Sequence, residues 1–169
     1  MQTFAPLPSL VKSMRVLDSQ RLGKQRVEGI QILITLLGMS PNDGWANHPA
    51  CRMWRGSTAA LAVYTFAACQ EWKKRDYEDG MAIGLRALLG RADPALALAS
   101  SLYSVQRLGW YASTEGPLCF RGWDDDAPWW WGDEKFHSSH RSNLLRKDPK
   151  HYRQFGWTDD PTKDYYWPD

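Results

Sequence analysis

The sequence has no apolar run long enough to span a membrane, and its N-terminus lacks the basic-then-apolar pattern of a signal peptide. It contains no Walker motif, no Rossmann glycine fingerprint and no other glycine-rich phosphate loop, which counts against enzymes that use nucleotide cofactors. Its three cysteines include no C-x-x-C pair, which argues against a disulfide framework or a closed cysteine zinc site. These absences predict a soluble protein of the reducing cytoplasm.

Net charge is also small, +2 at pH 7, but it is unevenly distributed. Basic residues gather between Lys12 and Arg26 and again between Arg141 and Arg153, whereas acidic residues gather at 124–126 and 159–160. We therefore expect a basic face on a nearly neutral molecule. Ten tryptophans and seven tyrosines supply large flat side chains that either pack in a core or stack on bases.

The 169 residues fit a single domain, 1–169, and their patterns predict an all-α fold. Pro6 and Pro8 disfavour helix and predict an extended arm over residues 1–12. Helices are expected from 9–13 to 37, from 51–55 to 74, and over 82–89, 94–102 and 133–146, with a helical turn after Pro149. A long irregular loop is expected over 109–132, and the aromatic C-terminal tail is expected to pack back on the body.

The segment LDSQRLGKQRVE, residues 17–28, places three bases, Arg21, Lys24 and Arg26, close to the carboxylate of Glu28. On a helix, spacings of three, four and seven bring Arg21, Lys24, Glu28 and Gln31 onto one face. The stripe expected to be buried on another face is Val27, Ile30, Leu33, Ile34 and Leu37. A single acid among bases indicates a site that acts on an anion. The alternative is a solvated helix face with an ordinary Lys24–Glu28 ion pair.

Two further segments carry residues typical of nucleic-acid contacts. Residues 138–143, SSHRSN, followed by Arg146 and Lys147, combine small hydrogen-bond donors with cations that suit a phosphate backbone. The alternative is a solvated helix with capping serines. Residues 48–56, HPACRMWRG, combine an indole, Trp54, with guanidinium groups that could stack on a base or hold a strand. Trp54 at a helix start is equally suited to the core.

One set of residues has spacings compatible with a metal site: His48, Cys51, His137 and His140. His48 stands beside Pro49 and His140 beside Arg141, so both also suit hydrogen bonding near phosphates. We expect no metal at these positions.

The motif QRLGKQRVE resembles the first-helix motif of the endonuclease V, or pyrimidine-dimer DNA glycosylase, family. Matched on that motif, the family's catalytic glutamate falls on Glu28. The connector around Asn47–His48, the following helix ending CQEWKKRDY, and the basic, aromatic C-terminal section are also similar to the family, whereas residues 81–133 have no counterpart. The resemblance implies a small all-α domain without a cofactor. It also implies that the N-terminal α-amine attacks C1′ of a damaged nucleotide to form an imine, after which β-elimination cuts the strand.

The start of the chain departs from the family pattern. Phage members expose a small residue after removal of the initiator methionine, but Gln2 disfavours that removal, so Met1 is expected to persist. The arm before Glu28 is also longer. The nucleophile is therefore expected to be the amine of Met1 or of a processed terminus, with Lys24, one turn from Glu28, as second choice; the absence of lyase chemistry is the third reading. An α-amine suits the role because its pKa of about 8 leaves part of it neutral at neutral pH.

Together these observations predict a DNA glycosylase with AP lyase activity on damaged or modified pyrimidines, pyrimidine dimers foremost, acting by base flipping. The alternatives are a modified-base enzyme of the same fold without lyase activity and a non-catalytic DNA-binding module. We expect a monomer that acts on double-stranded DNA in the cytoplasm, associated with the nucleoid. The expected catalytic residues are Glu28, Met1 and Lys24. The expected DNA contacts are Arg21, Arg26, His48, Arg52, Arg55, His140, Arg141, Arg146 and Lys147.

Overall fold

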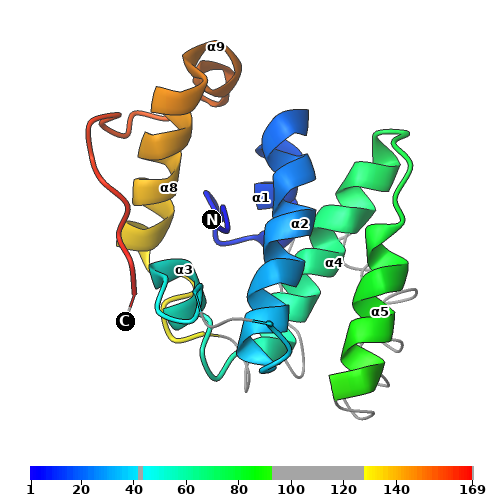
Figure 1. The fold of residues 1–169 in the computed structure, drawn as a ribbon. Helices are drawn as coiled ribbons and strands as arrows, with labels where there is room; N and C mark the ends of the chain where they lie inside the picture. The colour runs from blue at the N-terminus through cyan, green and yellow to red at the C-terminus, as the bar shows by residue number, and fades with distance from the viewer. Residues whose placement is uncertain (42–43, 93–127, 169) are drawn as a thin grey trace.

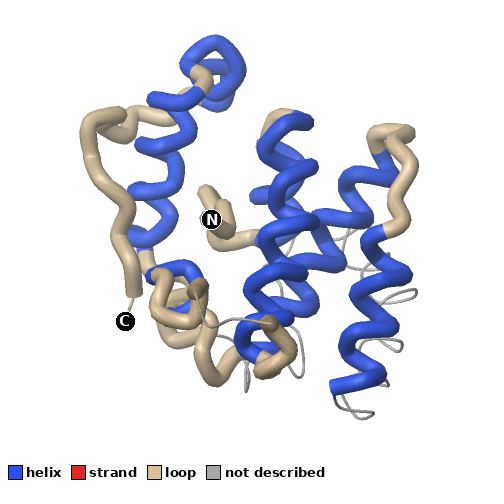
Figure 2. The backbone as a smooth tube through the Cα atoms, viewed as in Figure 1, coloured by secondary structure: helices blue, strands red, loops and turns tan. Residues whose placement is uncertain are grey.

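The computed structural model describes residues 1–41, 44–92 and 128–168, and every regular element in these ranges is a helix (Figures 1 and 2). The all-α prediction is therefore confirmed. The α-helices are α1 (Leu10–Val16), α2 (Ser19–Leu36), α3 (Pro49–Arg52), α4 (Thr58–Lys74), α5 (Met81–Ala92), α8 (Glu134–Lys147) and α9 (Pro149–Tyr152), and a 3-10 helix, η2 (Arg153–Phe155), follows. None of the helices in the described ranges is long and apolar enough to cross a bilayer.

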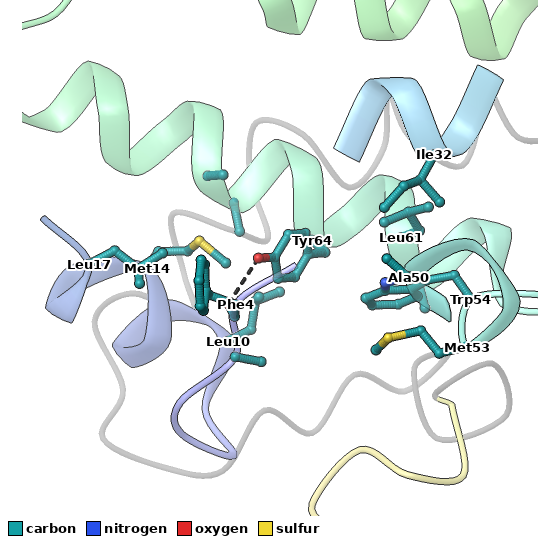
Figure 3. Close-up of a cluster of buried hydrophobic side chains, with 14 of the residues drawn as sticks. Phe4, Leu10, Met14, Leu17, Ile32, Ala50, Met53, Trp54, Leu61 and Tyr64 are labelled. Carbon is teal, nitrogen blue, oxygen red and sulfur yellow. Dashed lines mark hydrogen bonds between the residues drawn. The ribbon is translucent and has the colours of Figure 1, made fainter. Parts of the chain in front are cut away.

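The alanine-rich helix α4 lies at the centre of the fold, as the sequence predicts. It packs against α1, α2 and α5 (Figure 1), and its side chains Leu61, Tyr64 and Phe66 are buried. The approach of α2 is close because Gly29 has no side chain: a Cβ there would lie 2.3 Å from Thr65 Oγ1. Figure 3 shows the resulting core, in which residues of the N-terminal arm pack beside those of α4.

Residues 9–37 do not form the single helix that the sequence pattern suggested. The chain breaks at Leu17, which is extended, and Asp18 caps α2 because its side chain accepts a hydrogen bond from the backbone N–H of Arg21. The buried stripe of α2 also differs from the prediction, since Val27 is 40 % exposed. The buried residues are Leu22, Gln25, Gly29, Ile32 and Leu33.

The other expected helices are close to the observed ones. The helix predicted from 51–55 to 74 is divided into α3 and α4 near Gly56, whose φ of +78° ends α3's turn. α5 extends the predicted 82–89 at both ends, and α8 begins after its cap, Asp133, as expected. The predicted helix 94–102 and most of the loop 109–132 lie outside the described residues, while 128–132 form turns.

Residues 1–9 form the N-terminal arm, which is non-helical and ends where Ser9 caps α1. The arm is thus shorter than the predicted 1–12. It lies between α8 and α2 (Figure 1), and its residues from Gln2 to Pro6 are buried. The C-terminal tail runs back along α8, and Tyr165, Tyr166 and Trp167 pack against the core, as predicted. The tail therefore reaches the N-terminal arm, where the Tyr165 ring contacts that of Phe4.

Candidate active site

The start of the chain is joined directly to Glu28. The backbone N–H of Gln2 donates a hydrogen bond of 3.2 Å to Glu28 Oε2, and the N–H of Thr3 donates to the side-chain oxygen of Gln2 at 2.9 Å. One residue of extended chain spans only about 3.5 Å, so the amine of Met1 lies within one such step of this contact. The arm thus begins beside Glu28. That its amine is the nucleophile stays a prediction.

The next residues of the arm are held by α2, by α4 and by the turn between α3 and α4. The N–H of Phe4 donates to Gln25 Oε1 at 2.8 Å, and the Tyr64 hydroxyl lies 2.9 Å from the Phe4 carbonyl oxygen (Figure 3). The Trp54 indole N–H donates to Thr3 Oγ1 at 2.9 Å. Burial, and then the charge of Glu28, raise the pKa of Tyr64, so its hydroxyl stays a donor. Side chains thus hydrogen-bond to backbone groups of this extended segment, as a neighbouring strand would in a sheet.

From the other side, α8 holds the arm at Ala5 and Pro6. Ala5 bonds to both His137 and His140, and Arg141 Nη1 donates to the Pro6 carbonyl oxygen at 3.0 Å. Arg141 is fixed in turn by Asp159, whose Oδ2 lies 2.6 Å from Arg141 Nε. Although burial opposes it, hydrogen bonds from Arg141 and Ser138 lower the pKa of Asp159, which stays ionised beside the guanidinium.

A cavity of about 290 Å³ opens at the point where the arm meets α2. This volume is close to the lower limit of ligand pockets, about 300 Å³. The arm contributes Met1, Gln2 and Phe4, and the C-terminal part contributes Lys147 and Tyr165. The wall formed by α2 consists of Gln20, Arg21, Lys24, Gln25 and Glu28.

Among the described residues that line the cavity, Glu28 is the one carboxylate and is surrounded by cations. Lys24 and Lys147 are exposed. Arg21 is held at the rim by Asp18, with Nη1 2.6 Å from Oδ2, and its guanidinium lies over the Tyr152 ring. Of the four residues that the helical spacing placed on one face, Arg21, Lys24 and Glu28 line this cavity and Gln31 does not. A cavity with this charge suits an anionic ligand that carries a reactive group near a carboxylate.

Several residues expected to contact DNA lie elsewhere on the surface or at the edge of the site. Arg146 and Lys147 are exposed at the end of α8, and Arg146 donates to Asn143 Oδ1. Arg52 and Arg55 are exposed on the α3–α4 turn and line a second cavity, and Arg55 also donates to the Ala46 carbonyl oxygen at 2.8 Å. No described contact brings this pair to Glu28.

His48 lies near the terminus. Its Nδ1 accepts the N–H of Ala50 at 3.1 Å and so caps α3, and the ring contacts Trp45 and Trp167. Burial, followed by the positive charge of the terminal amine, lowers the pKa of His48. The imidazole is therefore neutral at neutral pH, at the edge of the region that contains the amine.

Three other residues that were predicted to contact DNA are buried or form ion pairs within the protein. Arg26 turns away from the cavity, where it pairs with Asp79 (Nη1 to Oδ1, 2.6 Å) and covers the Trp72 ring. His140 is fully buried, and Arg141 is committed to Asp159, Glu134 and the Pro6 carbonyl. The neighbouring serines are also internal: Ser139 and Ser142 donate to carbonyl oxygens of α8 itself. The SSHRSN segment is therefore mostly core and arm support.

The residues considered as metal ligands do not gather around one point. His137 and His140 bond to the arm, while His48 caps α3. In the described part of the chain no group of three or more His, Cys, Asp or Glu side chains could hold a metal ion. Cys51 and Cys69 are buried free thiols.

Sequence reasoning missed four contributors: Gln2, Gln25, Tyr64 and Tyr165. Gln25 carries a usable signal, because a glutamine one turn after Leu22 and one turn before Gly29 is a polar residue on the apolar face of a helix. Such a residue needs a partner, and here the partner is the arm. Tyr165 borders the cavity, and burial raises its pKa to about 12, so it is a neutral donor there.

Comparison with known families adds an independent finding. A model of the pyrimidine dimer DNA glycosylase family matches residues 1–83. Residues 1–83 are therefore similar to the pyrimidine dimer DNA glycosylase family. No curated protein and no solved structure matches the chain. The match over residues 1–83 supports a DNA glycosylase function and action on DNA.

The pyrimidine dimer DNA glycosylase match covers only part of the candidate site. It includes the arm, Lys24, Glu28 and the helices from α1 to α4. It does not include α8 or the tail, which contribute Lys147 and Tyr165 to the cavity and His137 and His140 to the arm. The site is therefore assembled from the segment that matches the family and from the C-terminal part of the chain.

Proposed function

We propose that this protein is a DNA glycosylase with AP lyase activity, in which the amine at the start of the chain attacks C1′ of a damaged pyrimidine nucleotide and Glu28 moves the protons. The observation that carries the proposal is the hydrogen bond between the Gln2 N–H and Glu28 Oε2, because it holds the terminus beside the lone carboxylate of a cationic cavity. The family match over residues 1–83 supports the glycosylase part.

The chemistry balances without a cofactor. The neutral amine forms a bond to C1′ as the bond from C1′ to the base breaks, and the base leaves with the electron pair and takes up a proton. The attached nitrogen then loses a proton, and protonation of the ring oxygen opens the sugar and leaves an iminium at C1′. Removal of a C2′ proton then expels the 3′ phosphate, which cuts the strand, and water later releases the amine. A carboxylate can protonate the ring oxygen in its acid form and remove the C2′ proton in its ionised form, and it also stabilises positive charge at C1′.

The anchored arm supports this role for the terminus. A flexible N-terminus would have to be ordered in each reaction, whereas here the residues after Met1 are fixed in advance by Glu28, Gln25 and Tyr64. Such preorganisation is among the larger contributions an enzyme makes to a two-partner reaction. Met1 itself is partly exposed at the cavity, so a substrate has access to it.

The cations around the cavity support DNA as the substrate. Lys24 and Lys147 are exposed and line the same cavity as Glu28, and Arg21 is held by Asp18 and lies over the Tyr152 ring. Phosphates on both sides of a damaged nucleotide would meet these charges, and each such contact adds affinity that falls as salt is added. Double-stranded DNA as the form bound, extrusion of a base on binding and a monomeric enzyme are part of this proposal.

Incision assays test the proposal. Duplex oligonucleotides with a cyclobutane pyrimidine dimer or with an abasic site are incubated with the wild type, with Glu28→Gln and with Glu78→Gln, an exposed control that undergoes the same chemical change. We expect cleavage of both substrates, a loss of about 100-fold or more in Glu28→Gln, and no loss in the control. Unchanged cleavage in Glu28→Gln would refute the role of Glu28. Base release without strand cleavage would refute the lyase part, and DNA binding without either reaction would indicate a binding module.

A further inference from the structure

The two buried histidines of α8 hold both polar groups of a single peptide residue in the arm. The N–H of Ala5 donates to His140 Nδ1 at 2.8 Å, and the Ala5 carbonyl oxygen lies 2.7 Å from His137 Nδ1. All three residues are buried, so no water replaces these bonds. Two side chains one helical turn apart on α8 therefore hydrogen-bond to both backbone polar groups of Ala5.

The bonds fix the proton positions of both rings. His140 Nδ1 accepts a hydrogen bond, so the proton of this neutral ring is on Nε2. His137 has the opposite arrangement: its Nδ1 carries the proton that is donated to Ala5, and its Nε2 accepts the N–H of Gly132 at 3.2 Å. Burial lowers the pKa of both histidines, which keeps them neutral. Two neutral imidazoles in complementary tautomers thus match the donor and the acceptor of one residue.

A residue that only filled space in the core would not need the imidazole nitrogens. His140 Nε2 is buried without a hydrogen-bond partner among the described residues, although its ring packs against Phe4, Phe136 and Tyr165. An apolar side chain would fill the same space without an unpaired N–H. The feature that an imidazole adds here is the Nδ1 acceptor for Ala5.

We propose that His137 and His140 are positioning residues for the reaction: by gripping Ala5 they fix the N-terminal arm, and so keep the amine at the start of the chain beside Glu28. This inference rests on the proposed function, since it assigns the amine as nucleophile. Neither histidine touches the cavity that the substrate would enter. Their effect is transmitted through the short chain from Ala5 to Met1.

The experiment compares asparagine and glutamine at each histidine. The amide of asparagine lies where His Nδ1 lies, so His140→Asn and His137→Asn keep a partner for Ala5. The amide of glutamine lies where Nε2 lies, so His140→Gln and His137→Gln lose that partner while remaining polar and of similar size. A third type of control, Leu89→Ala, removes a buried side chain of α5, on the far side of the molecule, and lowers stability without touching the arm (Figure 1).

Three quantities are measured: the rate of borohydride-trapped adduct with pre-formed abasic DNA in single turnover, the DNA dissociation constant, and hydrogen exchange at the arm amides. For the glutamine variants we expect trapping to slow by about 10- to 100-fold at unchanged DNA affinity, with faster exchange at Ala5. The asparagine variants should recover most of the rate and the protection. Leu89→Ala should trap at the wild-type rate under conditions where it is folded.

Equal rates in the glutamine variants and the wild type would overturn the inference, and so would asparagine variants that are as slow as the glutamine variants. A parallel loss of DNA affinity would assign the histidines to DNA binding instead. If the wild type itself forms no adduct, the proposed function fails, and the positioning role fails with it. The exchange measurement then still decides whether the histidines hold the arm.

Discussion

Lowering the pH should destabilise this protein through His140 before its carboxylates are protonated. Burial lowers the pKa of His140 to about 3 in the folded state, whereas the ordinary value is 6.5. Between these values the unfolded chain binds a proton at this residue and the folded protein does not. The free energy of unfolding therefore falls as the pH falls through this window.

The size of the effect follows from the two pKa values. One pKa unit corresponds to about 1.4 kcal/mol, so His140 alone should remove about 2 to 3 kcal/mol of stability between pH 6 and pH 4. A typical domain has about 5–15 kcal/mol in total, so this loss is easily measured. The pKa values of His48 and His137 are also lowered and act in the same direction. Around His137 the charges of Glu134, Asp133 and Arg141 modify the shift.

Urea unfolding followed by tryptophan fluorescence at half-unit steps from pH 7 to pH 4 measures this dependence. The useful comparison is with His140→Asn, which keeps an acceptor for Ala5 but has no proton to gain. As the pH falls, the unfolding free energy of the wild type should decrease relative to that of the variant, by about 2 to 3 kcal/mol over two pH units. Asp18 and Asp159, whose pKa values are lowered, lose their contribution only at still lower pH. Parallel curves for the two proteins would refute the burial of a neutral His140.

Two further predictions concern the helical body. Gly29→Ala should lower stability by about 1–3 kcal/mol because its Cβ would lie 2.3 Å from Thr65 Oγ1. Gly84→Ala, whose Cβ would meet nothing within 4 Å, should raise stability by up to about 1 kcal/mol. Shifts of the same sign in the urea midpoints of the two variants would contradict this packing. Asp79→Asn should cost about 3 kcal/mol because it leaves the Arg26 guanidinium without its buried partner, and a neutral change in the midpoint would show that the pair is not buried in solution.

The sequence predicted those parts of the site that depend on local spacing. Arg21, Lys24 and Glu28 share one cavity because they lie on one face of a single helix, and the prolines of the arm keep it extended. It also predicted α4 as the central helix from its alanine-rich apolar pattern. The helix break at Leu17 was missed because Asp18 resembles any other polar residue until it is seen to cap α2.

Long-range partnerships could not be read from the chain. His140 and Arg141 look like phosphate ligands in a basic segment, but they contact Ala5 and Pro6, 135 residues earlier. The pattern of a basic helix is the same whether its cations face DNA or hold a distant backbone carbonyl. Gln25 is likewise a polar residue on the buried face of α2, because its hydrogen-bond partners are in the arm and in α4. Tertiary structure, not helical periodicity, decides these assignments.

The most direct test of the account identifies the atom that carries the sugar. Abasic duplex DNA is incubated with the wild type and with Lys24→Arg, borohydride is added, and the trapped protein is digested and mapped by mass spectrometry. The account predicts that the sugar is attached to the α-amine of the N-terminal peptide in both proteins, with similar yields. Attachment to Lys24, with loss of the adduct in Lys24→Arg, or no adduct in either protein, would contradict it.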